Sequence, residues 1–305
     1  MHTHQTRSSA ISLVVPTRNR AHTLALVAPS YFTQEGVSEI LFVDDHGDDD
    51  TAAVIAEIAR SHPEISCQVV RNPERRGASQ SRNVGAAIAT GEYVLFCDDD
   101  EYLEPGYARI CREKLEALGA GAISGRRVYM LDGETPEEAL RRFGHGLRGG
   151  RPFNRVLCEV ANGARFEGDL RMPFTNAIIL TRRSLLLRYP FDGHYARGNG
   201  YREETDFQMN LFVNGYDIYV TNDCHSIHLP MSQVRTGGQR VRRFHRIYWS
   251  VHYTRYFFDK YYERYAARER VSVPKQVALP LYALYATYRE LLRPTLYTLA
   301  MTLSR

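Results

Sequence analysis

A cluster of three carboxylates follows directly on the apolar run 93–97: Asp98, Asp99 and Asp100. The apolar run predicts a buried strand, so the aspartates are expected at the carboxyl end of that strand. Crowded carboxylates repel one another, and a divalent cation that binds several of their oxygens offsets this cost. Mg²⁺ typically combines one or two carboxylates with phosphate oxygens of a ligand. The triplet therefore indicates a metal site that serves a phosphate-bearing ligand, although a solvated acidic turn would have the same composition.

A second acidic group has the same design. Asp44 and Asp45 follow the apolar run 39–43 and precede the turn-forming stretch 46–50. In open α/β sheets, ligands bind in the crevice beyond the carboxyl ends of the strands, where both acidic groups would lie. We therefore expect the two groups to contribute to one shared site.

The elements that would position these groups alternate along the first third of the chain. Strand-like runs occur at 11–15, 39–43, 68–70 and 93–97, and helix-like segments at 23–32, 50–61, 78–89 and 107–118. This alternation predicts βαβ units and a mostly parallel sheet. Residues 10–105 are therefore expected to form a nucleotide-binding half. Residues 106–236 are less regular, and Gly- and Arg-rich stretches such as 144–151 suit loops that form or close a binding site.

Composition excludes several classes of protein. The 305 residues carry 44% hydrophobic and 24% charged residues, which is typical of a globular protein. Five widely spaced cysteines without a CxxC pair argue against a disulfide framework or a structural zinc site, so a reducing, cytoplasmic setting is expected. Residues 1–9 have no apolar secretory core and are expected to be a flexible N-terminus. The longest uncharged apolar stretch, 276–288, is too short to span a bilayer.

Several motifs occur in a fixed order, at 11–20, 39–45, 77–83, 91–100, 174–177, 191–192, 203–206 and 215–216. Together they resemble glycosyltransferase family 2, the inverting enzymes of the GT-A fold. The resemblance covers about residues 10–230 and its ordered motifs are specific. It implies an α/β fold with a Rossmann-like, doubly wound, mostly parallel sheet and a catalytic domain at 10–236. It also implies a nucleotide-diphosphate sugar donor (a UDP-, GDP- or dTDP-sugar) and a divalent cation, Mn²⁺ or Mg²⁺.

Carried over position by position, the resemblance places Pro16, Thr17 and Arg18 at the nucleotide, with Asp45 bonded to the base. A carboxylate can accept a hydrogen bond from a uracil or guanine N–H. Arg82 would face the diphosphate, because a guanidinium matches phosphate oxygens and a helix N-terminus favours anions. An ordinary surface arginine on an amphipathic helix is the alternative.

The resemblance also implies the metal ligands. Asp100 is the implied direct ligand, and Asp98 and Asp99 lie nearer the ribose or a metal-bound water, with Asp98 as a further candidate ligand. His228 falls near the position where relatives place another metal ligand, although a lone histidine is as often structural. His225 takes that role if the alignment shifts.

The general base departs from the family pattern. Relatives usually carry Glu-Asp before the final helix, with the aspartate as base, and that position here is Glu204. We expect Glu204 to deprotonate the acceptor hydroxyl, with Asp206 as a rival, because glutamate has the same acid–base chemistry and a longer reach. A helix N-terminus that favours acidic residues would explain both without catalysis. Two alternatives stay open: a sugar-phosphate nucleotidyltransferase, and an inactive scaffold that binds nucleotide sugars.

The segment 237–305 is basic and rich in aromatic residues. Apolar residues at helical spacing flanked by arginines predict amphipathic helices, which suit a membrane interface through residues 240–303. Packing on the catalytic domain, or on a second subunit in a homo-oligomer, is the alternative. Nucleic acid is not an expected partner, because no nucleic-acid module accompanies the patch. The prediction is an enzyme of surface glycan or glycolipid synthesis, peripheral at the inner face of the cell membrane, with a glycan or lipid-linked acceptor.

Overall fold

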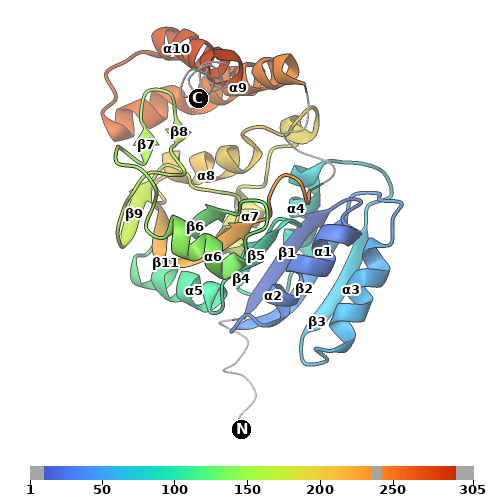
Figure 1. The fold of residues 1–305 in the computed structure, drawn as a ribbon. Helices are drawn as coiled ribbons and strands as arrows, with labels where there is room; N and C mark the ends of the chain where they lie inside the picture. Colours follow the sequence, from blue (N-terminus) through green and yellow to red (C-terminus); the bar gives the residue numbers. More distant parts are fainter. Residues whose placement is uncertain (1–9, 235–241, 293–305) are drawn as a thin grey trace, which may run out of the picture.

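The computed structural model describes residues 10–234 and 242–292. Within them, nine strands form one twisted sheet in the order β3-β2-β1-β4-β10-β6-β11-β5, with β9 paired to β11 (Figure 1). The strands of this sheet are β1 (Ile11–Thr17), β2 (Val37–Asp44), β3 (Ser66–Arg71), β4 (Tyr93–Phe96), β5 (Glu101–Leu103), β6 (Ala122–Tyr129), β9 (Asp169–Met172), β10 (Leu180–Arg182) and β11 (Ile218–His228). A separate hairpin consists of β7 (Phe153–Asn154) and β8 (Glu159–Val160).

Helices cover both faces of the sheet. The α-helices are α1 (Ala21–Val27), α2 (Pro29–Phe32), α3 (Thr51–Arg60), α4 (Ala78–Ile88), α5 (Tyr107–Ala117), α6 (Pro136–Phe143), α7 (Arg183–Arg188), α8 (Glu203–Val213), α9 (Arg243–Glu269) and α10 (Lys275–Thr287). Two short pieces are a 3₁₀ turn, η1 (Gly193–Ala196), and a π turn, η2 (Tyr288–Leu292). The predicted helix at 23–32 is two helices, because Pro29 lacks the N–H that would continue α1 and instead begins α2.

The four predicted strands are β1 to β4, and they pair in parallel as expected. β10 inserts antiparallel between β4 and β6, and β11 runs parallel to β6. Because β10 is antiparallel to both of its neighbours, β4 and β6 run in the same direction, and so does β11. The carboxyl ends of β4, β6 and β11 therefore lie at the same edge of the sheet. This edge carries the candidate site.

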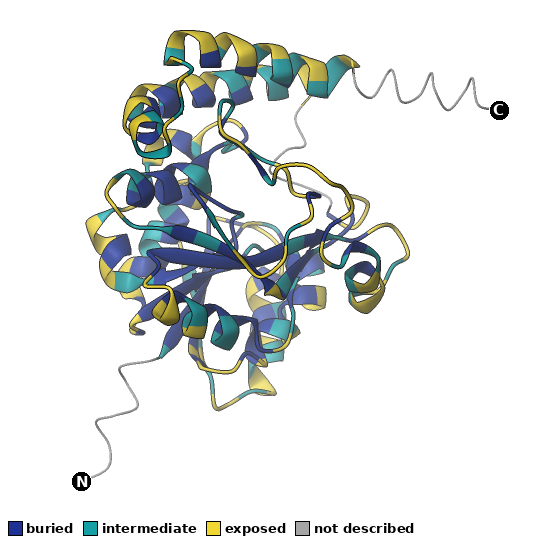
Figure 2. Ribbon diagram, turned by 90° about the vertical axis from the view of Figure 1, so that its left-hand side faces the viewer, coloured by how far each residue is buried: buried dark blue, intermediate teal, exposed yellow. Residues whose placement is uncertain are grey.

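The alternation of side chains along each strand creates two cores. Leu13 and Val15 face one core with α1, α2, α3, α5 and α6, whereas Val14 faces the other core with α4, α7, α8, α9 and α10. Figure 2 shows the buried strands between the two helical layers. The doubly wound arrangement predicted from the sequence is therefore present.

The C-terminal helices pack over α8 at the far end of the second core (Figure 1). The buried face of α9 is mostly aromatic: Tyr253, Phe257, Phe258, Tyr261, Tyr262 and Tyr265. Packing on the rest of the chain, one of the two alternatives, thus accounts for this face. Among the described helices, none combines the length and the apolar composition that crossing a bilayer requires. The expected flexible segment 1–9, the boundary near 237 and the tail beyond 292 lie outside the described residues.

Candidate active site

Four strand ends meet at the acidic cluster. The aspartates Asp98 to Asp100 follow β4 and lead directly into β5, whose first residue is Glu101. β5 pairs antiparallel with β11 in a register that sets His228 opposite Glu101. The same His228 pairs with Tyr129 at the end of β6. Residues far apart in the sequence are thus brought to one point by strand register alone.

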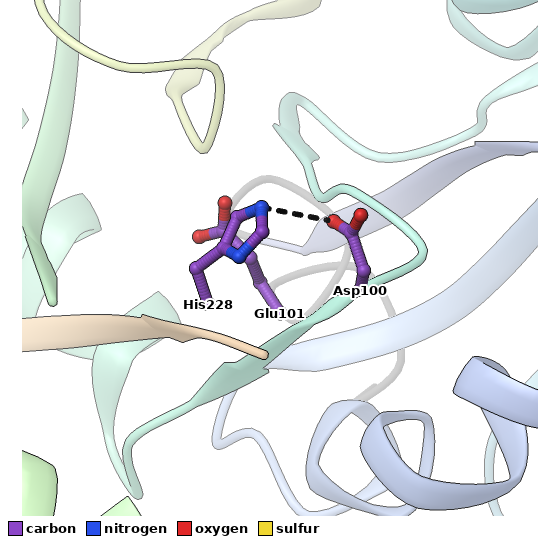
Figure 3. A group of neighbouring side chains, drawn as sticks. All are labelled: Asp100, Glu101 and His228. Atoms are coloured by element: carbon purple, nitrogen blue, oxygen red, sulfur yellow. Dashed lines mark ion pairs between the residues drawn. The ribbon is translucent and has the colours of Figure 1, made fainter. Parts of the chain in front are cut away.

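This register produces a group that could hold a cation. Ligand atoms of Asp100, Glu101 and His228 all lie within 4.8 Å of one another. Figure 3 shows the three side chains, with His228 Nε2 3.8 Å from Asp100 Oδ1. Glu101 is fully buried; apart from the ion pair of its Oε1 with Arg127, neither carboxylate oxygen has a hydrogen-bond partner in the described part of the chain. Buried carboxylate oxygens beside an imidazole are ligands that a divalent cation can use, so the residues fit such an ion.

Asp98 contacts two arginines and is not part of the cluster of Asp100, Glu101 and His228. Arg82 Nη2 donates to Asp98 Oδ1 and Arg127 Nη2 to Asp98 Oδ2, each at 2.9 Å. Burial raises the pKa of Asp98, but the charges of Arg82 and Arg127 outweigh burial and hold that pKa below its ordinary value. Arg127 also forms an ion pair with Glu101. Asp98 therefore joins the two arginines to the strand end.

Arg82 connects the acidic strand end to α8. Its guanidinium is almost fully buried and contacts Asp98, Glu203 and, at 3.4 Å, Glu204. The helix that carries Arg82 lies very close to β1, because a Cβ at Gly85 would come within 2.3 Å of Val14. Burial, together with the neighbouring Glu204 and Asp98, outweighs the Arg82 charge and raises the pKa of Glu203 to about 8. Arg82 thus connects the predicted base Glu204 to Asp98 at the acidic strand end.

A third arginine, Arg20, faces the remaining aspartates. Arg20 Nε lies 3.4 Å from Asp99 Oδ1, and Arg20 Nη1 lies 3.8 Å from Asp100 Oδ2. The turn that directs Arg20 there contains Asn19 at φ 57°, a conformation that asparagine tolerates, fixed by hydrogen bonds with Asp48. Burial raises the pKa of Asp99 to about 7 in spite of Arg20. Because Asp48 belongs to the acidic stretch after β2 and Asn19 to the loop after β1, that stretch fixes the loop that carries Arg20.

The predicted nucleotide residues lie along the same edge. Pro16 and Thr17 are buried at the end of β1, and Arg18 is exposed. Asp45 is buried and accepts hydrogen bonds from the backbone N–H groups of Arg76 (2.7 Å) and Gly77 (2.8 Å). Asp45 consequently fixes the loop that begins α4, and its contact with a base stays a prediction.

Asp206 and His225 have other partners. Asp206 is buried and accepts hydrogen bonds from Lys260 at 2.7 and 2.8 Å, Tyr195 at 2.8 Å and Tyr261 at 3.0 Å. These contacts tie α8 to α9 and occupy both oxygens of the carboxylate. His225 Nδ1 lies 2.8 Å from Glu104 Oε2, and His225 is not part of the Asp100, Glu101 and His228 group. The geometry accordingly favours Glu204 over Asp206, and His228 over His225.

Sequence reasoning missed Glu101, Arg127, Arg20 and Glu203 as members of the site. Glu101 directly follows the aspartates, and its position was a usable signal. Arg20 and Glu203 stand within the ordered motifs but received no role. Arg127 has no local signal, since only the β6–β11 pairing brings it to the edge.

Residues 12–192 match the model of the family described as Glycosyl transferase family 2. A protein of Mycobacterium tuberculosis is 32% identical over 225 residues, which are 70% of this chain and 65% of the relative. The GalNAc(5)-diNAcBac-PP-undecaprenol beta-1,3-glucosyltransferase of Campylobacter jejuni is 33% identical over 174 residues, 57% of this chain and 54% of the relative. The chain thus spans less than two thirds of the length of either relative.

Solved structures share the fold. TarS 1–349 of S. aureus, in complex with UDP-GlcNAc, has a TM-score of 0.60 at 16% identity, covering 92% of this chain and 73% of TarS 1–349. The mannosyltransferase PcManGT from Pyrobaculum calidifontis, in complex with GDP-Man and Mn²⁺, has a TM-score of 0.59 at 19% identity. The match covers 97% of this chain and 80% of PcManGT. The GT-A fold predicted from the sequence is confirmed.

Proposed function

The chain belongs to glycosyltransferase family 2, and from this premise we propose that it transfers a sugar from a nucleotide-diphosphate donor to an acceptor hydroxyl with inversion. The observation that carries the proposal is the Arg82 contact set, which joins Glu204 to Asp98 at the end of β4. We place the sugar of the donor beside this contact set, next to both the base and the acidic strand end. A UDP-, GDP- or dTDP-sugar is the proposed donor.

In the proposed reaction, Glu204 accepts the proton of the acceptor hydroxyl while that oxygen attacks the anomeric carbon. The nucleoside diphosphate leaves from the opposite face, so the configuration inverts. Glu204 is about one third exposed, which lets it meet an incoming acceptor. Arg82 holds Glu204 toward the donor and acts as a positioning residue. Pro16, Thr17, Arg18 and Asp45 are proposed for the nucleotide because they lie along the ends of β1 and β2.

Asp100, Glu101 and His228 are the residues proposed to hold a divalent cation, Mn²⁺ or Mg²⁺, with Asp98 and Asp99 oriented by Arg82, Arg127 and Arg20. Such an ion would stabilise negative charge on the departing diphosphate. The Mn²⁺ in the complex of PcManGT with GDP-Man supports this choice of ion.

Donor binding should be metal-dependent. We expect one class of nucleotide sugar, tested with Mn²⁺, Mg²⁺ or EDTA, to raise Tm only when metal is present, because a ligand of the folded state stabilises that state. Asp100→Ala should abolish the metal-dependent part of the shift. Asp132→Ala, an exposed aspartate outside the cluster, serves as the control. An unchanged Tm with every nucleotide sugar and metal would overturn the proposal.

We also propose that the protein lies on the inner face of the cell membrane, where it would meet a lipid-linked acceptor for surface glycan synthesis. An exposed apolar stripe runs along α10 and η2, with side chains 43–68% exposed: Val277, Leu281, Leu284, Tyr288 and Leu292. At this spacing the residues share one helix face. The exposed Phe244 and Tyr248, with Arg242 and Arg243 beside them, add the aromatic and basic groups that favour anionic lipid.

This contact can be measured by sedimentation with phosphatidylglycerol vesicles at low salt. We expect the protein to pellet with the vesicles and Leu284→Asp to reduce the bound fraction severalfold, because the new charge lies in the middle of the stripe. Leu26→Asp, an exposed leucine on α1, should bind like the wild type. If the wild type stays in the supernatant and forms dimers through the stripe instead, the membrane proposal is wrong.

A further inference from the structure

A small hollow of about 30 Å³ opens next to the candidate active site, and its lining comes mostly from residues 126–176. Its polar wall is formed by Arg126, Arg127, Asn162, Thr175 and Asn176. The hollow belongs to none of the donor or metal groups described above, apart from sharing Arg127. The hollow could therefore bind a group other than the donor or the cation.

Arg126 is a buried cation whose partners are all neutral. It is 2% exposed, and its guanidinium donates to the side-chain oxygen of Asn222 and to the carbonyls of Ala164 (3.1 Å) and Phe166 (3.3 Å). The guanidinium also lies 3.9 Å from the centroid of the Phe166 ring. Burial lowers the pKa of Arg126 to about 10, so the group remains charged at neutral pH. Buried charges are normally paired, and the described residues supply no carboxylate for this one.

The loops around the hollow add further positive charge. Residues 144–166 contain one acid, Glu159, which already pairs with Arg202. The same stretch contains four exposed arginines: Arg148, Arg151, Arg155 and Arg165. None of these four lines the hollow itself, but an excess of positive charge on the surrounding surface raises the local concentration of anions. The Gly- and Arg-rich stretch predicted to form or close a binding site therefore suits an anion.

The residues that line the hollow contact two parts of the candidate active site. On one side, Arg127 reaches Asp98 at 2.9 Å. On the other, the backbone N–H of Thr175 donates to Gln208 Oε1 at 2.8 Å, and Gln208 Nε2 donates to the carbonyl of Glu204 at 3.3 Å. The lining of the hollow is thus connected to the acidic strand end through Arg127 and to the start of α8 through Gln208.

We propose that this hollow binds an anionic group of the acceptor, a phosphate or a carboxylate, and that Arg126 supplies the buried charge that recognises it. The assignment rests on the proposed function, because it names the substrate class for the same site. An acceptor of this kind would place its charged group at Arg126 and present a neighbouring hydroxyl to Glu204.

The test measures binding without donor or metal, so that its failure is separate from a failure of sugar transfer. Methyl phosphate and glucuronate are titrated by calorimetry at constant ionic strength, with methyl glucoside as the neutral probe. One of the two anions is expected to bind, and the neutral probe is not. The stronger anion identifies whether phosphate or carboxylate is the preferred group.

Two variants locate the binding. Asn162→Asp adds a negative charge at the exposed rim of the hollow and should weaken anion binding at least about tenfold, because like charges at a binding surface are strongly unfavourable. Arg126→Met should have a comparable or larger effect if it folds, and Asn162→Asp keeps the test decisive if it does not. Asn154→Asp, on the hairpin outside this hollow, should bind like the wild type. Absence of anion binding, or equal binding by Asn162→Asp and wild type, would overturn the inference.

Discussion

Replacing Glu204 with glutamine is expected to lower kcat by about 10²- to 10⁴-fold, the usual contribution of a positioned general base. The glutamine keeps the size of the side chain and can still contact Arg82, which lies 3.4 Å from Glu204. Donor binding should therefore change little, and the loss should appear in kcat rather than in the donor-induced shift of Tm. Transfer from the donor identified by thermal shift, measured with saturating acceptor, gives the comparison.

Asp206→Asn is the matched control for Glu204→Gln, because both changes replace a carboxylate of α8 with an amide. Asp206 accepts hydrogen bonds from Lys260, Tyr195 and Tyr261, so its loss should lower the free energy of unfolding by about 1–3 kcal/mol. The folded fraction should keep a kcat near that of the wild type. A large fall in kcat for Asp206→Asn together with an active Glu204→Gln would reverse the assignment of the base.

Arg82→Met is expected to lower the free energy of unfolding by about 3–5 kcal/mol, the range found when one partner of a buried ion pair is removed. Arg82 is 2% exposed and contacts Asp98, Glu203 and Glu204, so the change removes one buried cation that three carboxyl groups share. Urea unfolding of the two proteins at the same pH measures the difference. Arg82→Lys keeps the positive charge but not the planar guanidinium, so its free energy of unfolding should fall by less than that of Arg82→Met.

The Arg82→Met deficit should depend on pH. Even with Arg82 present, burial raises the pKa of Glu203 to about 8, above the value of the unfolded chain. The folded state therefore holds a proton on Glu203 that the unfolded chain releases, and folding becomes less favourable as pH rises from about 5 toward 8. Without Arg82 the pKa of Glu203 should rise further, so the stability should keep falling above pH 8 and the deficit should grow there. A second change, Glu203→Gln, should restore part of the stability; a deficit independent of both pH and Glu203 would contradict the ion-pair explanation.

Local patterns were sufficient for the part of the site that follows single strands. The apolar runs before Asp44 and Asp98 predicted β2 and β4 and placed both acidic groups at one edge, as the parallel pairing requires. The helix carrying Arg82 was predicted for the same reason, since strand and helix alternate at short spacing. The likeness to known structures confirms the fold that these patterns indicated.

The pairings between distant segments could not be predicted in this way. The neighbours of Glu101 depend on the register between β5 and β11, and those of Asp206 depend on Lys260, which comes from a helix whose arginines suggested a membrane surface instead. That Arg82 faces a diphosphate stays a prediction, and its contact with Glu203 could not be read from its sequence context. In each case the contacting residue is distant in the sequence, so local sequence patterns could not predict the contact.

The strand register that sets His228 opposite Glu101 has a consequence for folding. Closing the long stretch of chain between them costs conformational entropy before any contact repays it, so this corner of the sheet is expected to form late. A cation captured by Asp100, Glu101 and His228 would bind the completed structure and no earlier intermediate. Such an ion would slow unfolding of the β5–β11 pair rather than speed its formation, so its effect would appear as kinetic stability and not as faster folding.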